Sequence, residues 1–570
     1  MSLVHVTDLT VEFGDLRAVD GLSFTLAPGA ALALVGESGS GKSTVASAVL
    51  GLHRGTGARV SGSVGVAGVD VQQASDDELR RLRGAKAAMV FQDPLSSLDP
   101  YYAIGDQIAE VHRVHTRVSR RTARARAVEV LDRVGIPDAV RRSRSRPHEF
   151  SGGMRQRALI AMALACEPEL LIADEPTTAL DVTVQAQILD LLHTLRQETG
   201  MGLLLVTHDV GVAAESVDDV LVMRHGRTVE HGPVGTVLRE PAEAYTRELL
   251  AAVPRVDAPR VSSGGSGGGA SGGFGGGVSG GSGEGVPGGS REGASGGSGE
   301  GAAEAVPEVV LEAVGLRREF GRGKKAFAAV DGVSLTVRRG ETLGVVGESG
   351  SGKTTLGRML VGLLEPTAGQ VRHDGLTRVG VNPAVQMVFQ DPVSSLNPRR
   401  SVGESIADPL RARGERDEQR IRGRVRELLE RVGLEGAHYD RYPHEFSGGQ
   451  RQRVGIARAL AADPRVIVCD EPVSALDVTT QAQVVALLGE LQRELGLALV
   501  FVAHDLAVVR QVSDRVAVMR RGRIVEQGPA DEVYDSPRDA YTKQLLTAVP
   551  ALDPEIAAQR RAERGAVAVG

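Results

Sequence analysis

The chain has 570 residues, which leaves room for several domains at about 150 residues each. Its 66 basic and 72 acidic residues give a formal charge of −6, so the composition does not favour a general nucleic-acid binder. No apolar run approaches the ~18 residues that cross a bilayer, and the N-terminal MSLVHVTDLTVEF lacks the basic and apolar segments of a secretion signal. We therefore expect a cytoplasmic protein that reaches a membrane only through partners.

The chain contains two copies of one unit, because five motifs recur in the same order. The offset is 311 residues at the first motif and 296 from the third motif onward, which predicts a gene duplication with fusion. The repeated pairs are GESGSGKST at 36–44 and GESGSGKTT at 347–355, FQDPLSSLDP at 91–100 and FQDPVSSLNP at 389–398, PHEFSGGMRQR at 147–157 and PHEFSGGQRQR at 443–453, ADEPTTALDVTVQAQ at 173–187 and CDEPVSALDVTTQAQ at 469–483, and VTHD at 206–209 and VAHD at 502–505.

Within each copy, short β-rich apolar runs alternate with helical patterns. Ala31–Val35, Leu170–Ala173 and Leu203–Thr207 predict buried strands of a mostly parallel sheet. The Arg-rich stretch at 105–146 has apolar residues at helical spacing and predicts an inserted helical subdomain, with a counterpart at 403–441. The predicted fold class is therefore α/β, in two tandem domains.

The two cysteines, Cys166 and Cys469, lie in equivalent stretches of the copies, each near an apolar run. Two cysteines are too few for a disulfide framework or a four-cysteine cluster. We expect both to be small buried hydrophobic residues.

A flexible joint is predicted between the copies. Ser262–Gly301 is about half glycine with much serine, so it cannot bury enough apolar surface to fold. Random-coil scaling gives such a tether an r.m.s. span of roughly 35 Å, which lets the domains dock in the orientation they prefer. The predicted division is 1–255 for the first domain, 256–306 for the linker, 307–550 for the second domain and 551–570 for a tail. The charged, alanine-rich tail fits either a short helix or a disordered segment.

A phosphate-binding loop is predicted between a strand and a helix in each copy. In the pattern Gly-x4-Gly-Lys-Ser/Thr, the glycines let backbone N–H groups wrap the phosphates, and the following helix adds a positive end. Lys42 and Lys353 are expected to reach the β- and γ-phosphates of ATP, and Ser43 and Thr354 to hold Mg²⁺. The nucleotide-binding residues of the two loops are Gly36, Glu37, Ser38, Gly39, Ser40, Gly41, Lys42, Ser43 and Thr44, and Gly347, Glu348, Ser349, Gly350, Ser351, Gly352, Lys353, Thr354 and Thr355.

An Asp-Glu pair follows an apolar strand in each copy, in LLIADE and VIVCDE. Asp174 and Asp470 can hold the water shell of Mg²⁺ opposite the phosphate loop. Glu175 and Glu471 are then placed to orient the attacking water. Such a pair alone also fits a turn with two solvated acids, but the phosphate loop in the same copy favours a catalytic role.

A third motif, Ser-Gly-Gly before an Arg-rich helix, resembles the signature of the ABC-type ATPases, and the resemblance covers almost the whole chain outside the linker. It implies two tandem P-loop NTPase domains, each with a mostly parallel sheet core and an inserted helical subdomain, that pack head to tail. ATP would lie between the phosphate loop of one domain and the signature helix of the other, whose N-terminus the serine can cap. One site would combine Lys42 with Ser447–Gln450, and the other Lys353 with Ser151–Met154. The signature residues are Ser151, Gly152, Gly153, Ser447, Gly448, Gly449 and Gln450.

The resemblance assigns further residues position by position. Gln92 and Gln390 match the glutamine that contacts Mg²⁺ and the attacking water. His208 and His504 match the switch histidine that contacts the γ-phosphate, which we count with Glu175 and Glu471 as catalytic.

Two further matches concern the edges of the site. Ala179–Asp181 and Ala475–Asp477 match the loop where the two domains touch. Phe13 and Phe320, which lie 23 and 27 residues before the first loop glycine, are predicted to stack on adenine. Aromatic residues near strand ends more often serve packing, so this assignment rests on the resemblance alone.

One signature position departs from the usual pattern. Met154 stands where the second copy has Gln450, and methionine offers no amide to the nucleotide. The site that uses Ser151–Met154 is therefore expected to bind or turn over ATP differently. It should still work, because Asp470, Glu471 and His504 are present.

The FQDP and PHEFSGG motifs, with the endings EAYTRELLAAVP at 243–254 and DAYTKQLLTAVP at 540–551, resemble the ATPase subunits of the peptide and nickel importer group. The His-Pro of that group's C-terminal segment is replaced here, and no cysteine cluster follows it, so no iron–sulfur centre is expected. The resemblance implies a peripheral protein at the cytoplasmic face of the plasma membrane, with two membrane permease subunits and an extracytoplasmic solute-binding protein as partners. The permease helices would dock beside the segments after Gln92 and Gln390. The solute, whether peptide, nickel, glutathione or sugar, is not encoded in this chain.

Two other classes remain as alternatives. A ribosome-associated translation factor of the tandem ABC type also has two ATPase copies, but its linker is a long charged helical segment, whereas this one is rich in Gly and Ser. A scaffold with dead ATP sites conflicts with two complete sets of catalytic residues.

Overall fold

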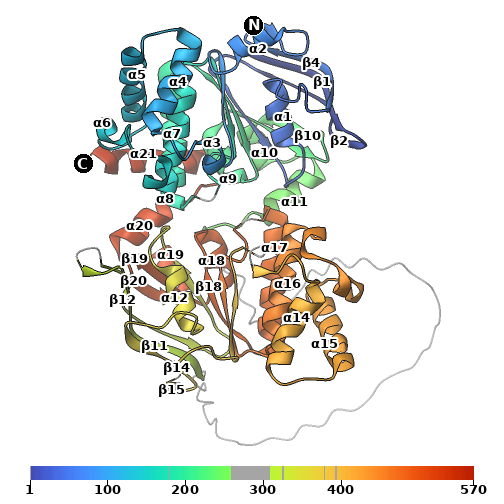
Figure 1. The fold of residues 1–570 in the computed structure, drawn as a ribbon, viewed down its shortest axis with the longest axis vertical. Coiled ribbons are helices and arrows are strands. Elements are labelled where there is room, and N and C mark those ends of the chain that lie inside the picture. Colours follow the sequence, from blue (N-terminus) through green and yellow to red (C-terminus); the bar gives the residue numbers. More distant parts are fainter. Residues whose placement is uncertain are drawn as a thin grey trace, which may run out of the picture.

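The computed structural model describes residues 2–178, 180–257, 308–323, 326–377, 379–391, 395–474 and 476–569. These residues form two halves of the same architecture, one above the other in Figure 1. The first half is the upper one in this view, and the second half is the lower one. The predicted linker, 256–306, lies outside the described residues apart from Val256 and Asp257.

A mixed sheet forms the centre of each half. Its strand order is β10-β9-β3-β8-β7-β6 in the first half and β20-β19-β13-β18-β17-β16 in the second, with parallel pairing except between the last two strands at one edge. Strands covered on both faces read as continuous apolar runs, and β3, β7, β13 and β17 are buried at every residue. The strands are β3 (Ala31–Val35), β6 (Ala87–Val90), β7 (Leu170–Asp174), β8 (Gly202–Thr207), β9 (Asp219–Arg224), β10 (Arg227–Pro233), β13 (Thr342–Val346), β16 (Val385–Val388), β17 (Val466–Asp470), β18 (Ala498–Val502), β19 (Arg515–Arg520) and β20 (Arg523–Pro529). The mostly parallel sheet and its three predicted strands are therefore confirmed.

A second, antiparallel sheet flanks each mixed sheet, and the sequence analysis did not predict it. Its order is β2-β1-β4-β5 in the first half and β12-β11-β14-β15 in the second. β1 alternates buried and exposed residues because one face packs on the core and the other faces solvent. The strands are β1 (Val4–Phe13), β2 (Leu16–Leu26), β4 (Arg59–Val66), β5 (Val69–Asp70), β11 (Val309–Phe320), β12 (Phe327–Arg338), β14 (Ala368–His373) and β15 (Leu376–Thr377).

Helices cover the sheets and carry the repeated motifs. The helix after each phosphate loop lies between the antiparallel and the mixed sheet and shares their core. In the first half the helices are α1 (Lys42–Val49), α2 (Asp76–Leu82), α3 (Pro94–Ser97), α7 (Gly152–Leu164), α8 (Val182–Thr199), α9 (Val210–Ser216), α10 (Val234–Arg239) and α11 (Ala244–Ala252). In the second half they are α12 (Lys353–Leu360), α16 (Gly448–Leu460), α17 (Val478–Leu495), α18 (Leu506–Val512), α19 (Ala530–Asp535), α20 (Ala540–Thr547) and α21 (Pro554–Val569). The tail, whose structure the sequence left open, is thus the helix α21.

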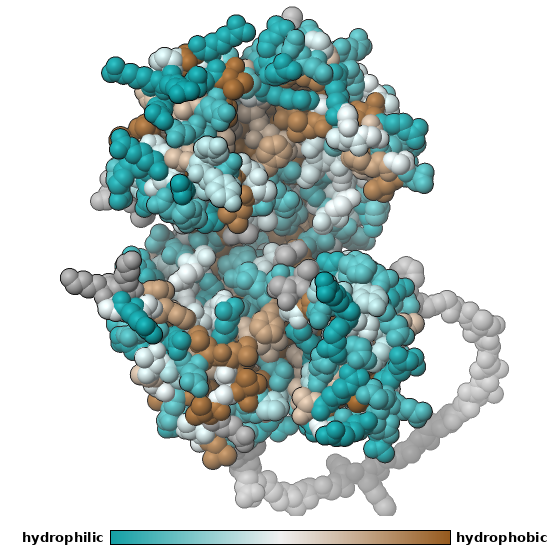
Figure 2. All heavy atoms as spheres, viewed as in Figure 1, coloured by the Kyte–Doolittle hydropathy of each residue, from teal (hydrophilic) through white to brown (hydrophobic). Residues whose placement is uncertain are grey.

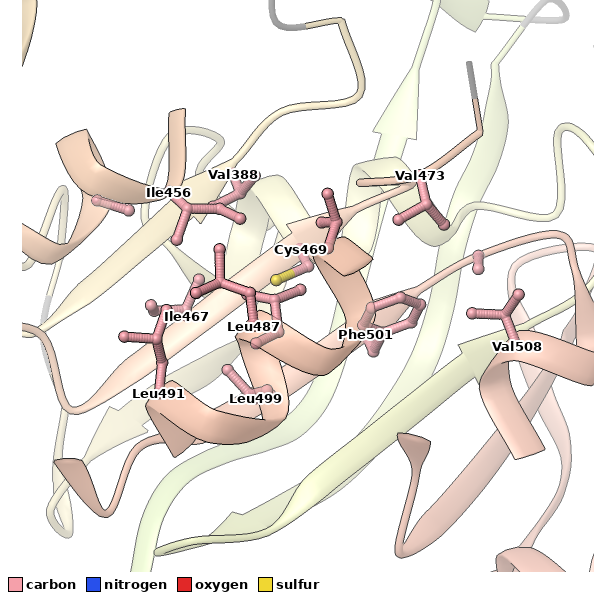
Figure 3. Close-up of a cluster of buried hydrophobic side chains, with 14 of the residues drawn as sticks. Val388, Ile456, Ile467, Cys469, Val473, Leu487, Leu491, Leu499, Phe501 and Val508 are labelled. Carbon is pink, nitrogen blue, oxygen red and sulfur yellow. The ribbon is translucent and has the colours of Figure 1, made fainter. Parts of the chain in front are cut away.

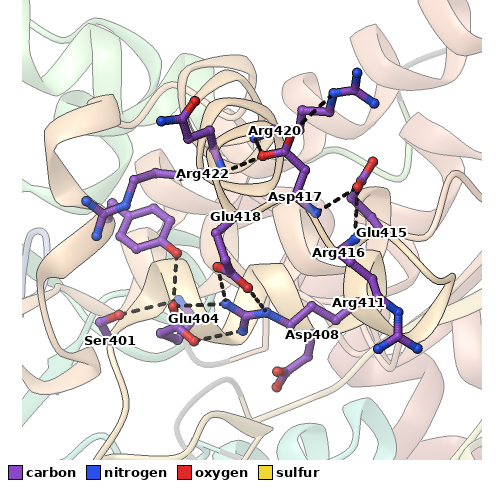
Figure 4. A network of polar contacts seen from close by, with 12 residues as sticks. Ser401, Glu404, Asp408, Arg411, Glu415, Arg416, Asp417, Glu418, Arg420 and Arg422 are labelled. Atoms are coloured by element: carbon purple, nitrogen blue, oxygen red, sulfur yellow. Dashed lines mark hydrogen bonds and ion pairs between the residues drawn. The ribbon is translucent and has the colours of Figure 1, made fainter.

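The inserted helical subdomain is confirmed in both halves. It consists of α4 (Ile104–Thr116), α5 (Arg120–Arg133) and α6 (Ala139–Arg142) in the first half, and of α14 (Val402–Ala412) and α15 (Glu418–Arg431) in the second. Figure 4 shows the polar network that joins α14 to α15, in which Arg411 bonds to Glu404 and Glu418 at 2.8 Å each. Exposed pairs of this kind contribute little singly, so the network fixes the orientation of the helices more than it adds stability.

The two cysteines differ in their surroundings. Cys469 lies at the end of β17 among side chains of α16, α17 and β18, as Figure 3 shows, and it is fully buried. Burial raises the pKa of its thiol to about 12, so it is a small core residue, as predicted. Cys166 is only half-buried, because it follows the end of α7, and its Sγ lies 4.0 Å from Nδ1 of His112.

The segments that leave the two halves cross over. Val256, after α11, packs against the core of the second half, and its carbonyl accepts a hydrogen bond from Arg510. Leu552, which follows α20, packs against the core of the first half. No helix among the described residues is long and apolar enough to span a bilayer.

Candidate active sites

The phosphate loops join β3 to α1 and β13 to α12, in the predicted context. Gly41 has a φ of 98°, and a Cβ there would lie 2.4 Å from the carbonyl oxygen of Ala18. Gly352 has the same surroundings, with 2.2 Å to the carbonyl oxygen of Ala329. Only glycine fits these positions, so the close approach of the loop to the neighbouring strand explains why the motif has glycine just before the lysine.

The loop lysines fold back into their own loops. Nζ of Lys42 donates to the carbonyl oxygens of Gly36 at 2.8 Å and Glu37 at 2.7 Å, and Lys353 makes the equivalent bonds at 2.7 and 2.9 Å. Burial lowers the pKa of both amines below the ordinary value. Each lysine therefore sits at the centre of its loop, held by carbonyls that phosphate oxygens can replace as partners.

A hydroxyl and a carboxylate face each other beside each loop. Oγ of Ser43 donates to Asp174 at 3.0 Å, and Oγ1 of Thr354 donates to Asp470 at 3.1 Å. Burial raises the pKa of both carboxyls, with a smaller opposing effect of the hydroxyl bond. Oxygen ligands in this arrangement are those that Mg²⁺ prefers, so the donor set fits the ion.

In the first half, the residue after Asp174 is held by three side chains. Glu175 accepts hydrogen bonds from Gln92 at 2.8 Å and Thr178 at 2.9 Å, and Nδ1 of His208 lies 3.1 Å from its other oxygen. Its backbone has a φ of 46°, a region that non-glycine residues rarely adopt and that is found most often at functional sites. The predicted glutamine, glutamate and histidine are thus brought together.

The second half repeats this arrangement with one difference. Glu471 has a φ of 47°, accepts a hydrogen bond from Gln390 at 2.7 Å and lies 3.3 Å from Nδ1 of His504. The residue equivalent to Thr178 is Ser474, whose hydroxyl donates to the backbone carbonyl of Glu471 instead of its carboxylate. The glutamate of the second half therefore has one partner fewer.

The charges of each glutamate–histidine pair support one another. Burial raises the pKa of Glu175, but the hydrogen bond and charge of His208 outweigh it, so the pKa lies below its ordinary value. Burial lowers the pKa of His208, but the hydrogen bond and the charge of Glu175 outweigh this effect. The pKa of His208 is therefore raised above its ordinary value. Glu471 and His504 shift in the same directions for the same reasons. Both carboxylates are therefore ionised at neutral pH.

The signature serines cap their helices, as predicted, but the caps differ. Oγ of Ser151 accepts the N–H of Met154 at 3.3 Å, and Ser447 accepts that of Gln450 at the same distance. The backbone N–H of Ser447 also donates to the side-chain carbonyl of Gln450 at 3.0 Å, which closes a reciprocal capping box. Met154 cannot make this bond, so the presence of methionine in place of glutamine changes the helix cap itself.

The halves meet where α8 and α17 begin, just after the segment that follows each Asp-Glu pair. Oγ1 of Thr183 bonds to the carboxylate of Glu348 in the opposite phosphate loop at 2.8 Å, and Thr479 bonds to Glu37 at the same distance. Ala179 and Ala475, predicted for this contact, lie outside the described residues, while Asp181 is among the groups whose charge acts on Lys353. Among the described residues, no hydrogen bond joins a signature serine to the opposite phosphate loop.

A cavity at the second phosphate loop contains residues of both halves. Thr178, Leu180 and Asp181 of the first half line it together with residues of the second. The lining from the second half is Phe320, Phe327, Ala329, Ser349, Gly350, Gly352, Lys353, Thr354, Thr355, Gln390, Asp391, Glu471, Ser474 and His504. The cavity thus brings together the loop, the glutamine, the glutamate and the histidine of the second half, whereas the signature residues Ser151–Met154 are not among its lining.

The two predicted adenine-stacking residues have different neighbours. Phe320 ends β11, lines the cavity and lies 6.0 Å from Phe327, ring centre to ring centre. Phe13 ends β1, where its ring meets the edge of His53. The sequence analysis missed Phe327, although its exposed position at the start of β12 beside a phosphate loop is a recognisable signal.

Sequence reasoning also missed a link from the C-terminal segment to the phosphate loop. The backbone N–H of Glu348 donates to Oη of Tyr541 at 3.0 Å, and Arg520 stacks over the tyrosine ring at 4.5 Å. Arg224 stacks over Tyr245 at 4.5 Å in the first half. These tyrosines belong to the repeated AYT ending, which was noted as a resemblance without a role.

The fold and the site define an ATP-binding protein of the ABC type. The family model described as "ABC transporter" matches residues 19–178 and 330–474, and the model "Oligopeptide/dipeptide transporter, C-terminal region" matches 229–268 and 525–568. The chain therefore belongs to the ATP-binding proteins of the ABC transporter family.

Curated relatives match along nearly the full length. "Glutathione import ATP-binding protein GsiA" of Salmonella choleraesuis is 44% identical over 98% of this chain and 91% of its own length. "Oligopeptide transport ATP-binding protein OppD" of Mycobacterium tuberculosis is 44% identical over 97% of this chain and 99% of its own length. The counterpart named GsiA in Pectobacterium atrosepticum is also 44% identical, over 97% of this chain and 90% of its own.

Proposed function

We propose that this chain is the ATP-hydrolysing component of an importer for peptides or a related small solute. The observation that carries the proposal is the pair of complete site sets, each with a phosphate loop, an Asp-Glu pair, a glutamine and a histidine, in a chain whose relatives are named as import ATP-binding proteins. The match to the oligopeptide/dipeptide C-terminal region at both AYT endings supports the peptide class. These relatives are not named as ribosome-associated proteins, so that alternative is not favoured.

In the proposed reaction, Lys42 and Lys353 exchange their loop carbonyls for the β- and γ-phosphates. Ser43 and Asp174, and their counterparts Thr354 and Asp470, would hold Mg²⁺, which neutralises phosphate charge when bound. The remaining site groups act on water and on the γ-phosphate.

The ionised Glu175 orients the attacking water, with Gln92 and His208 fixing its carboxylate at 2.8 and 3.1 Å. The histidine, whose pKa is raised, can donate to the γ-phosphate. Glu471 takes the same role in the second half with Gln390 and His504.

We propose that ATP joins the halves as the sequence predicted, with Lys42 facing Ser447–Gln450 and Lys353 facing Ser151–Met154. Two observations support this. The capped N-termini of α7 and α16 offer free N–H groups to an anion. The first turns of α8 and α17, which follow each Asp-Glu pair, already contact the opposite phosphate loop. ATP that contacts both halves only when they are closed favours the closed state by its difference in affinity.

The partners would be two membrane permease subunits and an extracytoplasmic solute-binding protein, with this chain at the cytoplasmic face of the plasma membrane. Support comes from exposed apolar side chains that follow Gln92 and from an apolar groove beside Gln390. Tyr101 and Tyr102 are 80% and 62% exposed. In the second half, a groove between the core and the helical subdomain is lined by Val361, Leu363 and Phe389, among others. Figure 2 shows hydrophobic side chains gathered on this half. Such patches mark docking sites for a helix.

We retain the predicted division into domains at 1–255 and 307–550, joined by 256–306 and followed by the tail. To test the function, the gene is deleted and uptake of labelled glutathione and of a labelled tetrapeptide is compared with and without complementation. Loss of uptake that returns with the wild-type chain, but not with Glu175→Gln/Glu471→Gln, supports the proposal. Unchanged uptake of both, with co-sedimentation of the chain on ribosomes, would overturn it.

A further inference from the structure

The last helix of the chain lies on the half to which it does not belong in sequence. α21 follows the second half, yet Figure 1 shows this helix, in red, against the upper half. It packs on α9 of the first half, and its side chains also bond to α8. A segment of one half therefore reaches across the nucleotide-binding interface.

Two arginines of α21 make most of the polar contacts. Arg564 binds Asp190 with two parallel bonds, Nε–Oδ2 at 3.0 Å and Nη2–Oδ1 at 2.9 Å, and also pairs with the carboxylate of Glu215. Arg561 bonds to the backbone carbonyl of Glu215 and lies 3.1 Å from Nε2 of His193. Bidentate arginine–carboxylate pairs are among the stronger and more directional polar contacts.

The contact is buried enough to matter. The side chain of Glu215 is 1% exposed and that of Arg564 is 14% exposed. A carboxylate buried this deeply is costly without a cation beside it, so removing the arginine leaves an unfavourable charge. The fork on Asp190 and the pair with Glu215 therefore depend on each other.

A second point of contact lies at the start of α21. Arg239, at the end of α10, pairs with Asp553 at 2.8 Å and Glu555 at 2.9 Å. We name the first-half residues Asp190, His193, Glu215 and Arg239 the clasp surface.

The clasp surface exists on only one of the two copies. With the offset of 296 residues that holds in this region, the second half has Ala486, Gly489, Gln511 and Asp535 at the four equivalent positions. Three of these lack the charged or imidazole group, and the fourth reverses the charge. Arg510 of the second half instead donates to the carbonyl of Val256, where the first half leaves α11. The clasp surface therefore occurs only on the first half, whereas the helix that it binds, α21, follows the second half in the sequence.

We propose that α21 and the clasp surface hold the two halves of one chain together in the absence of nucleotide. ATP then closes two halves that are already joined on one side, instead of collecting two separate bodies. The contact matters for the sites because Asp181, which caps the N-terminus of α8, lines the cavity at the second phosphate loop, and α9 begins two residues after His208. The contact of α21 with the clasp surface keeps the starts of α8 and α9 close to their positions between one round of ATP hydrolysis and the next.

The test measures whether the halves stay together when the covalent link is cut. A protease recognition sequence is placed within residues 262–301 of the full chain, the purified protein is cut in nucleotide-free, Mg²⁺-free buffer, and the products are run on size exclusion. We expect the cut halves to co-elute. Arg561→Glu/Arg564→Glu should weaken their association at least tenfold, so that two smaller species appear at the same concentration.

A matched variant changes the first-half side of the contact, using the residues found at the equivalent positions of the second half. Asp190→Ala/Glu215→Gln gives the first half the residues of the second, and it should also separate the cut halves. Combining it with the arginine variant should add little, because both remove the same contact. Gln559→Glu/Ala562→Glu, on the exposed face of α21, is the control and should leave co-elution intact.

Circular dichroism and thermal unfolding of each uncut variant show whether the halves remain folded. Separation of the cut wild-type halves would overturn the proposal, as would co-elution of the folded arginine variant. The readout uses no ATP and no transport, so its failure leaves the proposed function untouched, and a chain without transport activity can still show the clasp.

Discussion

The two halves are duplicates whose catalytic groups have stayed alike while their surroundings have diverged. In both, a glutamate in a strained backbone conformation lies within 3.3 Å of a histidine and accepts a hydrogen bond from a glutamine. The differences lie in the residues around these catalytic groups. They are the helix cap at the signature serine, the residue that starts β2 or β12, and the clasp surface. Phosphate chemistry allows little variation, whereas the groups that set affinity and hold the halves together can differ between sites.

The largest effect should come from the proposed catalytic pair. Glu175→Gln and Glu471→Gln each keep the shape of the side chain but remove the charge that orients water, so each should lower steady-state ATP turnover strongly. The double variant should lose at least about a hundredfold, the range typical of a removed general base. Glu169→Gln, an exposed residue paired with Lys86 at 3.8 Å, is the control.

If the sites are equivalent in chemistry, the two single variants should match. Full ATP turnover after either single change would show that the changed site does not hydrolyse ATP. The two halves would then differ in function, with one site that is catalytic and one that only binds ATP.

A smaller effect is expected at the adenine end of the sites. Phe327 lies beside Phe320 in the second half, whereas the equivalent residue of the first half is Leu16. Phe327→Leu should weaken nucleotide binding at the second phosphate loop by up to about tenfold, because aromatic contacts are worth roughly 0.5–1.5 kcal/mol. Leu16→Phe should strengthen binding at the first. Titration of a fluorescent ATP analogue, with the other site blocked by substitution of its loop lysine, measures both.

Equal affinities before and after the exchange would mean that neither residue faces adenine. The assignment of Phe13 and Phe320 would then need to be replaced as well, since it places the base in the same space.

The signature cap should give the next effect. Gln450→Met removes the bond between the Ser447 N–H and the amide carbonyl, and Met154→Gln allows that bond in the first half. One such bond is worth about 1 kcal/mol, which corresponds to about 2–4 °C in melting temperature for a half of this size. Thermal unfolding of both variants should show shifts of opposite sign. Shifts of the same sign would show that packing around Met154, and not the cap, decides the difference.

The sequence predicted which residues carry the chemistry of the sites better than it predicted the contacts between them. The loops, the Asp-Glu pairs and the helix caps are local in sequence, so short motifs define them. The contacts of Glu175 with Gln92 and His208 join three motifs, and they were placed only through a family resemblance. The antiparallel sheet was missed because its strands alternate buried and exposed residues over irregular registers, with bulges that break a simple period.

The contacts between halves were the hardest to foresee. Thr183 and Glu348 are 165 residues apart, and nothing in either motif signals that one hydroxyl bridges to the opposite loop. The tail is rich in alanine and charged residues and has few large apolar ones, so its composition left a helix and a disordered segment open. Its contacts with Asp190 and Glu215 lie on the other half, and no local pattern connects those residues to the tail.

The smallest expected effect concerns pH and tests whether the two glutamate–histidine pairs are alike. The raised pKa of His208 means that its ion pair with Glu175 stabilises the fold fully below about pH 6.5, the ordinary histidine value, and that this contribution is lost as the pH rises through the raised pKa. The pKa of Glu175 is lowered by His208, so its carboxylate stays charged and its contribution is lost only as the pH falls through that lowered pKa, on the acid side of the ordinary glutamate range.

His208→Ala should therefore lower the melting temperature more at pH 6 than at pH 9, by a difference of about 1–3 °C. His504→Ala should behave in the same direction, since its pKa is raised by the same kind of partner. The control is His225→Ala, which removes a histidine from an exposed turn. Because Glu175 has Thr178 as an additional partner and Glu471 lacks its equivalent, the second pair depends more on its histidine. The pH-dependent loss should accordingly be larger for His504→Ala, and a larger loss for His208→Ala would show that the third hydrogen bond does not offset the charge.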